Sequence, residues 1–187
     1  MAARTYGFIT IGNIVTLIGF ALVVIGVVLV VDARYLAGFL IIGAGRLCDL
    51  LDGWLADITK TKSYVGASFD VFADKFASLL ALLALPSSSL MPWWPAIGII
   101  IVQTVTGIAS TLVVRQKIPI FPVKSGKIGM AVIWAGILGY VVGAMFDGES
   151  GGVIRFLATC IAVVGVSFSG HAMLQYCRQY VATQRKS

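Results

Sequence analysis

Four long stretches of this chain carry no charged side chain. They cover residues 5–31, 76–114, 128–146 and 156–177. Because a helix needs about 20 apolar residues to cross the roughly 30 Å hydrocarbon core of a bilayer, each stretch is about long enough to span a membrane. The whole chain is 59% hydrophobic and only 12% charged, with a mean hydropathy of +0.97. This composition excludes an ordinary soluble domain.

The longest of these stretches contains a break. Pro86, Pro92 and Pro95 flank a tryptophan pair, which predicts a turn at the membrane interface. A further apolar run extends from Leu36 to Ala56. The sequence therefore predicts an all-α integral membrane protein, a single domain over residues 1–187 in which a bundle of six transmembrane helices holds a cytoplasm-facing polar cavity. The expected helices cover residues 8–31, 35–57, 67–88, 93–114, 126–146 and 153–177.

The basic residues predict the orientation of the chain. Short loops rich in Lys and Arg stay on the cytoplasmic side of a membrane. Only Arg34 and Arg155 fall on the opposite side in a six-helix topology, so we expect a multi-pass protein of the cell membrane with both termini cytoplasmic. The net charge of +6 then reflects a basic rim facing anionic lipid, and no motif indicates a nucleic-acid partner. The basic residues on the cytoplasmic side are Arg4, Lys60, Lys62, Arg115, Lys117, Lys124, Lys127, Arg178, Arg185 and Lys186.

Five of the eight acidic residues lie between positions 49 and 74. A carboxylate at membrane depth costs a few kcal/mol, so such residues usually face the interior of a bundle and mark a functional site. Asp49 and Asp52 are spaced i, i+3, and Asp70 and Asp74 are spaced i, i+4, which puts each pair on one face of its helix. We expect the two acidic faces to oppose each other.

Four clustered carboxylates need cations to neutralise them. Oxygen ligands without His or Cys nearby favour Mg²⁺ or Mn²⁺, and a divalent site beside Lys60 and Lys62 suits a phosphate-bearing ligand and phosphoryl transfer. Two other interpretations remain open at this point. The aspartates could form helix caps and ion pairs with Arg46, Lys60, Lys62 and Lys75, or they could line a proton or cation pathway.

The order of the residues resembles a known signature. Asp49-x-x-Asp52-Gly53-x-x-Ala56 is followed, after Asp57 and eight further residues, by Gly66-x-x-x-Asp70-x-x-x-Asp74. This pattern resembles DxxDGxxAR followed by eight residues and GxxxDxxxD, the signature of the CDP-alcohol phosphotransferase family. One position differs, because Asp57 stands where the signature has arginine.

The resemblance implies a role for each motif residue. Asp49, Asp52 and Asp70 would bind Mg²⁺ or Mn²⁺, with two ions expected, while Asp74 would also lie in the metal site and act as base on the acceptor hydroxyl. Gly53, Ala56 and Gly66 would lie against the CDP-linked donor. Lys60 or Lys62 could replace the missing arginine at the donor phosphates.

Further residues resemble the phosphatidylglycerophosphate synthase branch of the family. Asn13 and Thr16 match its amino-terminal NxxT, which implies a place near the donor nucleotide, and Gly126-Lys127-Ile128 resembles the start of its GKxKT segment. Val102 and Gln103 replace a common arginine and glutamate, and Gly129 replaces the second lysine. The cations expected to bind a phosphorylated acceptor are Arg115, Lys124 and Lys127.

The resemblance implies an enzyme of phospholipid synthesis that transfers a phosphatidyl group from CDP-diacylglycerol to an alcohol, with release of CMP. We expect glycerol 3-phosphate as the acceptor and a homodimer as the assembly. The alternatives are another acceptor (inositol phosphate, serine or phosphatidylglycerol), a non-catalytic homologue, and a cation-coupled transporter.

Overall fold

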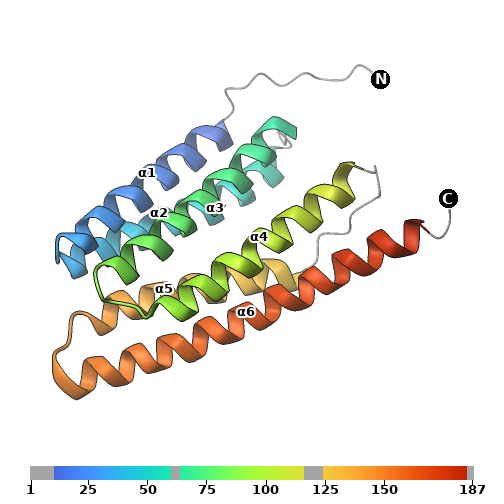
Figure 1. The fold of residues 1–187 in the computed structure, drawn as a ribbon. Helices are drawn as coiled ribbons and strands as arrows, with labels where there is room; N and C mark the ends of the chain where they lie inside the picture. The colour runs from blue at the N-terminus through green and yellow to red at the C-terminus, as the bar shows by residue number, and fades with distance from the viewer. Residues whose placement is uncertain (1–10, 60–63, 116–123, 185–187) are drawn as a thin grey trace. The chain divides into compact units, whose positions relative to one another are not determined.

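Every element of the structure is an α-helix. The computed structural model describes the backbone of residues 11–59, 64–115 and 124–184, and the side chains of residues 14–49, 51, 72–108, 125–175, 177, 178 and 181. Six helices follow one another with no strand among these residues (Figure 1). They are α1 (Ile11–Val31), α2 (Tyr35–Thr59), α3 (Tyr64–Ser87), α4 (Trp93–Arg115), α5 (Lys124–Gly143) and α6 (Gly148–Gln184).

The prediction of six helices is confirmed. The bounds of the first five agree with the expected ranges to within three residues at each end, and α6 is longer at both ends than expected. The predicted turn around Pro86 is also present, since Ser89 adopts a positive φ of 58° and its N–H donates to the carbonyl of Pro86. The chain divides into two compact units, which we call the amino-terminal unit (residues 1–85) and the carboxyl-terminal unit (residues 86–187).

In the amino-terminal unit, glycines bring α1 and α2 into close contact. A Cβ added to Gly26 would lie 2.9 Å from the backbone nitrogen of Ile42, and one added to Gly45 would lie 2.7 Å from the carbonyl oxygen of Gly19. Small residues of this kind let helix backbones approach closely within a membrane. The helix α3 contributes Phe76, whose ring lies 6.0 Å from that of Phe20 on α1.

In the carboxyl-terminal unit, α5 and α6 pack in the same way. A Cβ on Gly129 would lie 2.5 Å from the Ser169 hydroxyl oxygen, and one on Gly165 would lie 2.8 Å from the backbone nitrogen of Ile133. The helix α4 packs against α6. Tyr140, fully buried on α5, forms a hydrogen bond of 2.6 Å with Thr159 on α6.

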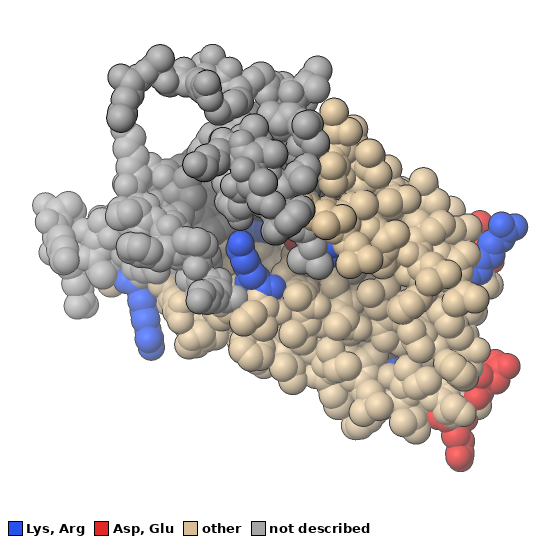
Figure 2. All heavy atoms as spheres, turned by 180° about the vertical axis from the view of Figure 1, so that it is seen from behind, with Lys and Arg blue, Asp and Glu red and all other residues tan. Residues whose placement is uncertain are grey.

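The outward surface of the helices is apolar. Large hydrophobic side chains such as Leu17, Ile101 and Phe156 are more than half exposed. On the face seen in Figure 2, most of the described surface is tan, the colour of residues other than Lys, Arg, Asp and Glu. A water-soluble protein rarely exposes apolar surface so widely, so a bilayer is the solvent that suits these helices.

Three helices of the described chain are long and apolar enough to cross a membrane. Their apolar spans are Ile14–Val31, Ser125–Gly143 and Gly148–Gln175, and a shorter apolar segment covers Trp93–Ile108. The remaining helices, α2 and α3, are 25 and 24 residues long but carry the charged residues of the acidic motifs. The protein is therefore embedded in a membrane, while six crossings, their orientation and a cytoplasm-facing cavity stay predictions.

The close contact of α1 with α2 generates the first testable prediction. Gly26→Ala should lower the free energy of unfolding by about 1–3 kcal/mol, because the new methyl group meets backbone that cannot move aside. The measurement is the midpoint of thermal unfolding in detergent. Gly43→Ala on α2 is the matched control, since a Cβ there has nothing within 4 Å and its midpoint should stay unchanged or rise. Equal midpoints for the two variants would contradict the prediction.

Candidate functional site

Arg46 joins the two acidic motifs. Its guanidinium contacts Asp49 at 2.9 Å, one helical turn along α2, and Asp74 on α3 at 2.5 Å. The spacing of three residues puts Arg46 and Asp49 on the same face of α2, so one side chain can reach both carboxylates. The expectation that the acidic faces of these helices oppose each other is thus met for Asp49 and Asp74.

A narrow crevice surrounds this group of three charges. Its volume is about 10 Å³, close to the minimum of roughly 10–15 Å³ that a single water needs, so it has room for a small occupant and none for a nucleotide. Its walls come from α1, α2 and α3 of the amino-terminal unit. The residues lining it are Thr16, Gly19, Phe20, Val23, Gly45, Arg46, Asp49, Ala73, Asp74 and Ala77.

Small residues bring the three helices together at the crevice. Gly19 and Gly45 face each other so closely that a Cβ on Gly19 would lie 3.0 Å from the carbonyl oxygen of Gly45. On α3, Ala73 and Ala77 flank Asp74 and are buried. Sequence reasoning missed these wall residues, although Gly45 directly precedes Arg46 and both alanines lie within one turn of Asp74. Small residues at such spacings are the signal that could have identified them.

Thr16 lies in the wall of the same crevice. It is 6% exposed and comes from α1, far along the chain from the acidic motifs. The NxxT pattern marked Thr16 as a donor-binding residue, and the fold brings it beside Asp49 and Asp74. Asn13, three residues earlier, belongs to α1, but its side chain is outside the described residues.

The charges in the crevice explain why it needs cations. One guanidinium faces two carboxylates there, and each of the three side chains is only 19–25% exposed to solvent. Partly buried carboxylates are costly without neutralisation. Arg46 provides positive charge here, as a bound cation would. The acidic oxygens come from two helices and have no His or Cys among them in the crevice. This donor set fits a hard divalent ion such as Mg²⁺ or Mn²⁺.

Some of the ion pairs considered as an alternative role for the aspartates are also present. Of the four cations weighed as partners, Arg46 pairs with Asp49 and Asp74. Within the described side chains no group of three or more His, Cys, Asp and Glu forms. Of the four motif aspartates, only Asp49 and Asp74 have described side chains.

The other motif residues fall on the same two helices. Asp52, Gly53 and Ala56 belong to α2, and Gly66 and Asp70 belong to α3, but their side chains are outside the described residues. The expected donor residues Lys60 and Lys62 lie outside the described chain altogether. The expected acceptor residues Arg115 and Lys124 stand at the end of α4 and the start of α5, without described side chains.

In the carboxyl-terminal unit, the structure shows what surrounds two residues that depart from the branch pattern. Gly129 is crossed so closely by α6 that any side chain would meet Ser169, so a lysine does not fit there in this structure. The Gln103 amide of α4 donates to the Met130 sulfur of α5 at 3.5 Å. Lys127, the remaining cation of this segment with a described side chain, is exposed in the first turn of α5.

Apolar helices that hold opposed carboxylates define a membrane-embedded protein with a charged crevice lined by α1, α2 and α3. The chain belongs to the CDP-alcohol phosphatidyltransferase family, whose family model matches residues 9–169. This span takes in both acidic motifs and Thr16. A search of curated proteins returned no match. Membership makes the chain a transferase of the class that moves a phosphatidyl group from a CDP-linked alcohol to an acceptor, and the family generally uses divalent metal ions.

The position of Arg46 generates the second prediction. In EDTA, Arg46→Gln should lower the free energy of unfolding by about 1–3 kcal/mol, because two partly buried carboxylates lose their cation. Saturating Mn²⁺ should remove most of that difference. The measurement is thermal unfolding with and without the metal. Arg34→Gln, an exposed arginine in the same unit, is the control and should behave like the wild type. An equal loss with and without Mn²⁺ would contradict a shared cation site.

Proposed function

We propose that this chain transfers a phosphatidyl group from CDP-diacylglycerol to glycerol 3-phosphate and releases CMP. One observation carries the proposal: Asp49 of the first motif and Asp74 of the second contact the same guanidinium in one crevice. Membership of the phosphatidyltransferase family gives that juxtaposition a chemical meaning. The acyl chains of the donor would stay in the bilayer while its phosphates reach the acidic motifs.

Four carboxylates would hold the metal. We assign Asp49, Asp52 and Asp70 as ligands of Mg²⁺ or Mn²⁺, with Asp74 at the edge of the same site and two ions in all. When bound, the ions supply positive charge against the donor phosphates as the bond to CMP breaks. The support from the described residues is the convergence of Asp49 and Asp74 from separate helices.

Asp74 would act as the base. Arg46 contacts its Oδ1, so we assign Oδ2 to the proton of the acceptor hydroxyl. As that proton moves to Asp74, the acceptor oxygen bonds to the phosphorus next to the diacylglycerol. The bond from this phosphorus to the oxygen of CMP breaks, and CMP leaves with the electron pair. Arg46 is a positioning residue in this scheme, because it fixes the carboxylate that takes the proton.

Donor recognition would involve residues of α1, residues of the acidic motif and two lysines. Thr16 lines the same crevice as Asp49 and Asp74, and Asn13 stands one turn earlier on α1. We further assign Gly53, Ala56 and Gly66 to close approach of the nucleotide, and Lys60 and Lys62 to its phosphates. These cations would offset the effect of Asp57, which carries negative charge where the signature has arginine.

Acceptor recognition would depend on few cations. We assign Arg115, Lys124 and Lys127 to the phosphate of glycerol 3-phosphate. The crowding at Gly129 leaves the helix without the second lysine of the branch pattern. This observation favours, as a second candidate, the same reaction on an acceptor that lacks a phosphate, such as serine. The proposal retains the expected topology, with both termini cytoplasmic, and the expected homodimer.

The third prediction tests catalysis directly. Purified protein given CDP-diacylglycerol and glycerol 3-phosphate should release CMP only with Mg²⁺ or Mn²⁺. Asp74→Asn should slow this release by about 10² to 10⁴-fold, because the base is lost, while donor binding stays largely intact. Asp32→Asn, an exposed aspartate between α1 and α2, is the control and should keep wild-type turnover.

The same assay separates the alternatives. Release of CMP with serine, inositol phosphate or phosphatidylglycerol in place of glycerol 3-phosphate would change the acceptor and keep the chemistry. Wild-type turnover in Asp74→Asn would remove the assigned base. No release of CMP with any acceptor would overturn the proposed reaction and favour a non-catalytic homologue or a cation transporter.

The fourth prediction concerns the position that departs from the signature. Asp57→Arg should raise the affinity for CDP-diacylglycerol, because it exchanges a negative for a positive charge beside the donor phosphates. We expect a gain of about tenfold, the size of one charge-assisted contact of roughly 1.4 kcal/mol. The measurement is a binding isotherm at constant salt. Asp57→Asn should give a smaller gain, and no change in either variant would show that residue 57 lies away from the phosphates.

A further inference from the structure

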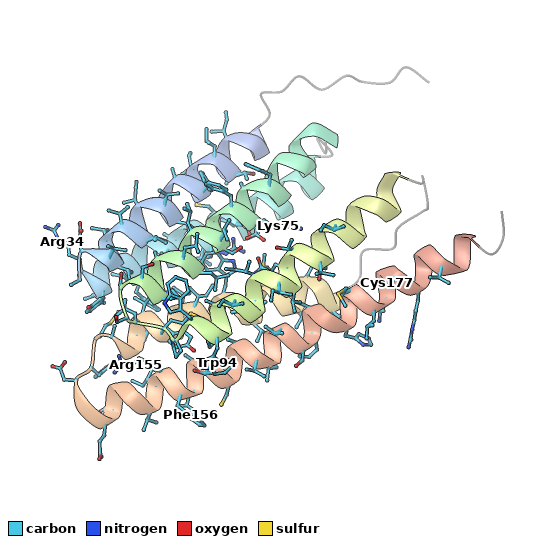
Figure 3. All side chains as sticks on the ribbon, in the orientation of Figure 1. Arg34, Lys75, Trp94, Arg155, Phe156 and Cys177 are labelled. Atoms are coloured by element: carbon cyan, nitrogen blue, oxygen red, sulfur yellow. The ribbon has the colours of Figure 1, made fainter. Side chains whose placement is uncertain are left out.

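A second, larger cavity lies in the carboxyl-terminal unit. It has a volume of about 420 Å³ and lies where α4 begins, against the first turns of α6. Figure 3 labels Trp94 on α4 and Arg155 and Phe156 on α6 in this part of the unit. None of its residues belongs to the acidic motifs. The lining residues are Ser89, Leu90, Met91, Pro92, Tyr140, Gly152, Arg155, Phe156 and Thr159.

Arg155 is the one charged residue in this lining. Its Nε donates to the carbonyl oxygen of Gly151 at 3.3 Å, and among the described side chains no carboxylate forms an ion pair with it. The neighbouring acidic residues, Asp147 of the α5–α6 connection and Glu149 in the first turn of α6, are exposed. The guanidinium therefore keeps donors for a ligand, since arginine has five N–H groups.

The aliphatic part of the Arg155 side chain packs against a glycine of α5. A Cβ on Gly143, at the end of α5, would lie 2.7 Å from Arg155 Cγ and 3.2 Å from its backbone nitrogen. The absence of a side chain at Gly143 thus makes the space through which this arginine passes. An arginine held in this way has a fixed direction, so it loses less conformational entropy when it binds an anion.

The other polar groups of the cavity bond to one another. The Thr159 hydroxyl donates to the carbonyl oxygen of Arg155 at 2.8 Å, so the Tyr140 hydroxyl is the donor in the 2.6 Å hydrogen bond between Tyr140 and Thr159. The remaining wall includes the apolar side chains of Leu90, Met91 and Phe156. The ligand that fits is one with a negative group for Arg155 and an apolar part for the wall.

The surroundings match a membrane interface. Trp93 and Trp94, at the start of α4, are 50% and 61% exposed, and exposed tryptophans favour the head-group level of a bilayer. Arg155 is seven residues from the start of α6 at Gly148, about 10 Å along the helix axis. It lies inside the apolar span Gly148–Gln175, so its charge is placed at the edge of the hydrocarbon region. Phe156, 68% exposed, follows it on the lipid-facing surface.

We propose that this cavity binds an anionic phospholipid, with the head-group phosphate on Arg155 and an acyl chain along Phe156. Charge complementarity supports this occupant, because the lining presents one positive charge and no negative one. The proposal does not depend on the proposed reaction. It adds a lipid site built from residues that the catalytic scheme does not use.

The test compares lipids on the purified protein in neutral detergent. Dioctanoyl phosphatidylglycerol should raise the midpoint of thermal unfolding and remain bound in native mass spectrometry, whereas the matching phosphatidylcholine should do so weakly. Arg155→Gln should reduce the affinity for phosphatidylglycerol by about fivefold or more, and Arg155→Lys should restore part of it.

A second variant fills the cavity without touching the charge. A Cβ on Gly152 has nothing within 4 Å, so Gly152→Leu should fold normally and block the lipid. Gly98→Leu on α4 is the matched control, because Gly98 has the same open space and is not part of the lining. The double variant Asp49→Asn/Asp74→Asn should keep the lipid effect, which separates this site from binding at the acidic crevice.

Three outcomes would overturn the proposal. Equal effects of phosphatidylglycerol and phosphatidylcholine would show that Arg155 has no role in choosing a lipid. A full effect from inorganic phosphate alone would make this a site for free anions. Unchanged phosphatidylglycerol affinity in both Arg155→Gln and Gly152→Leu would place the lipid elsewhere on the protein.

Discussion

The contact of one arginine with two aspartates inside an apolar bundle is the constraint on which the site depends. Arg46 lies between Asp49 and Asp74, and these two residues come from different helices and different halves of the acidic motif. Partly buried carboxylates in an apolar bundle require a positive charge. The arginine provides it within the chain, and the proposed divalent ion would add to it. Stability and proposed catalysis thus depend on the same charges.

Close helix packing makes that arrangement possible. Gly19 and Gly45 let α1 and α2 approach until a side chain on either would meet the other's backbone. The crevice can then be narrow and still include Thr16 from α1 beside the acidic residues of α2 and α3. In the carboxyl-terminal unit, the same kind of contact at Gly129 leaves no space for the lysine that the branch pattern has there. Packing therefore limits which side chains this position can carry.

Much of the fold could be predicted from the sequence because apolar length and proline are strong signals in a membrane protein. The charge-free runs predicted the helices α1 and α4 nearly to their ends, and the prolines around Ser89 predicted the turn between α3 and α4. The extra turns of α6 were missed because residues 148–152 are glycine, serine and glutamate, a glycine-rich segment that is a poor helix signal, and residues 178–184 lie beyond the apolar span.

The opposition of Asp49 and Asp74 followed from helical spacing. The pairing of Arg46 with both aspartates did not, because spacing along one helix cannot rank partners across two helices. Arg155 was interpreted from sequence only as a sign of orientation, because its cavity is also lined by residues such as Met91 that lie far from it in the chain.

We propose that the two acidic motifs form one divalent metal site. Electron paramagnetic resonance of Mn²⁺ measures this most directly, because the signal of free Mn²⁺ falls as the ion binds to protein. We expect saturable binding to the wild type and its loss in the double variant Asp49→Asn/Asp74→Asn, with Asp32→Asn unaffected. Saturable binding that survives in the double variant, or none in the wild type, would contradict it.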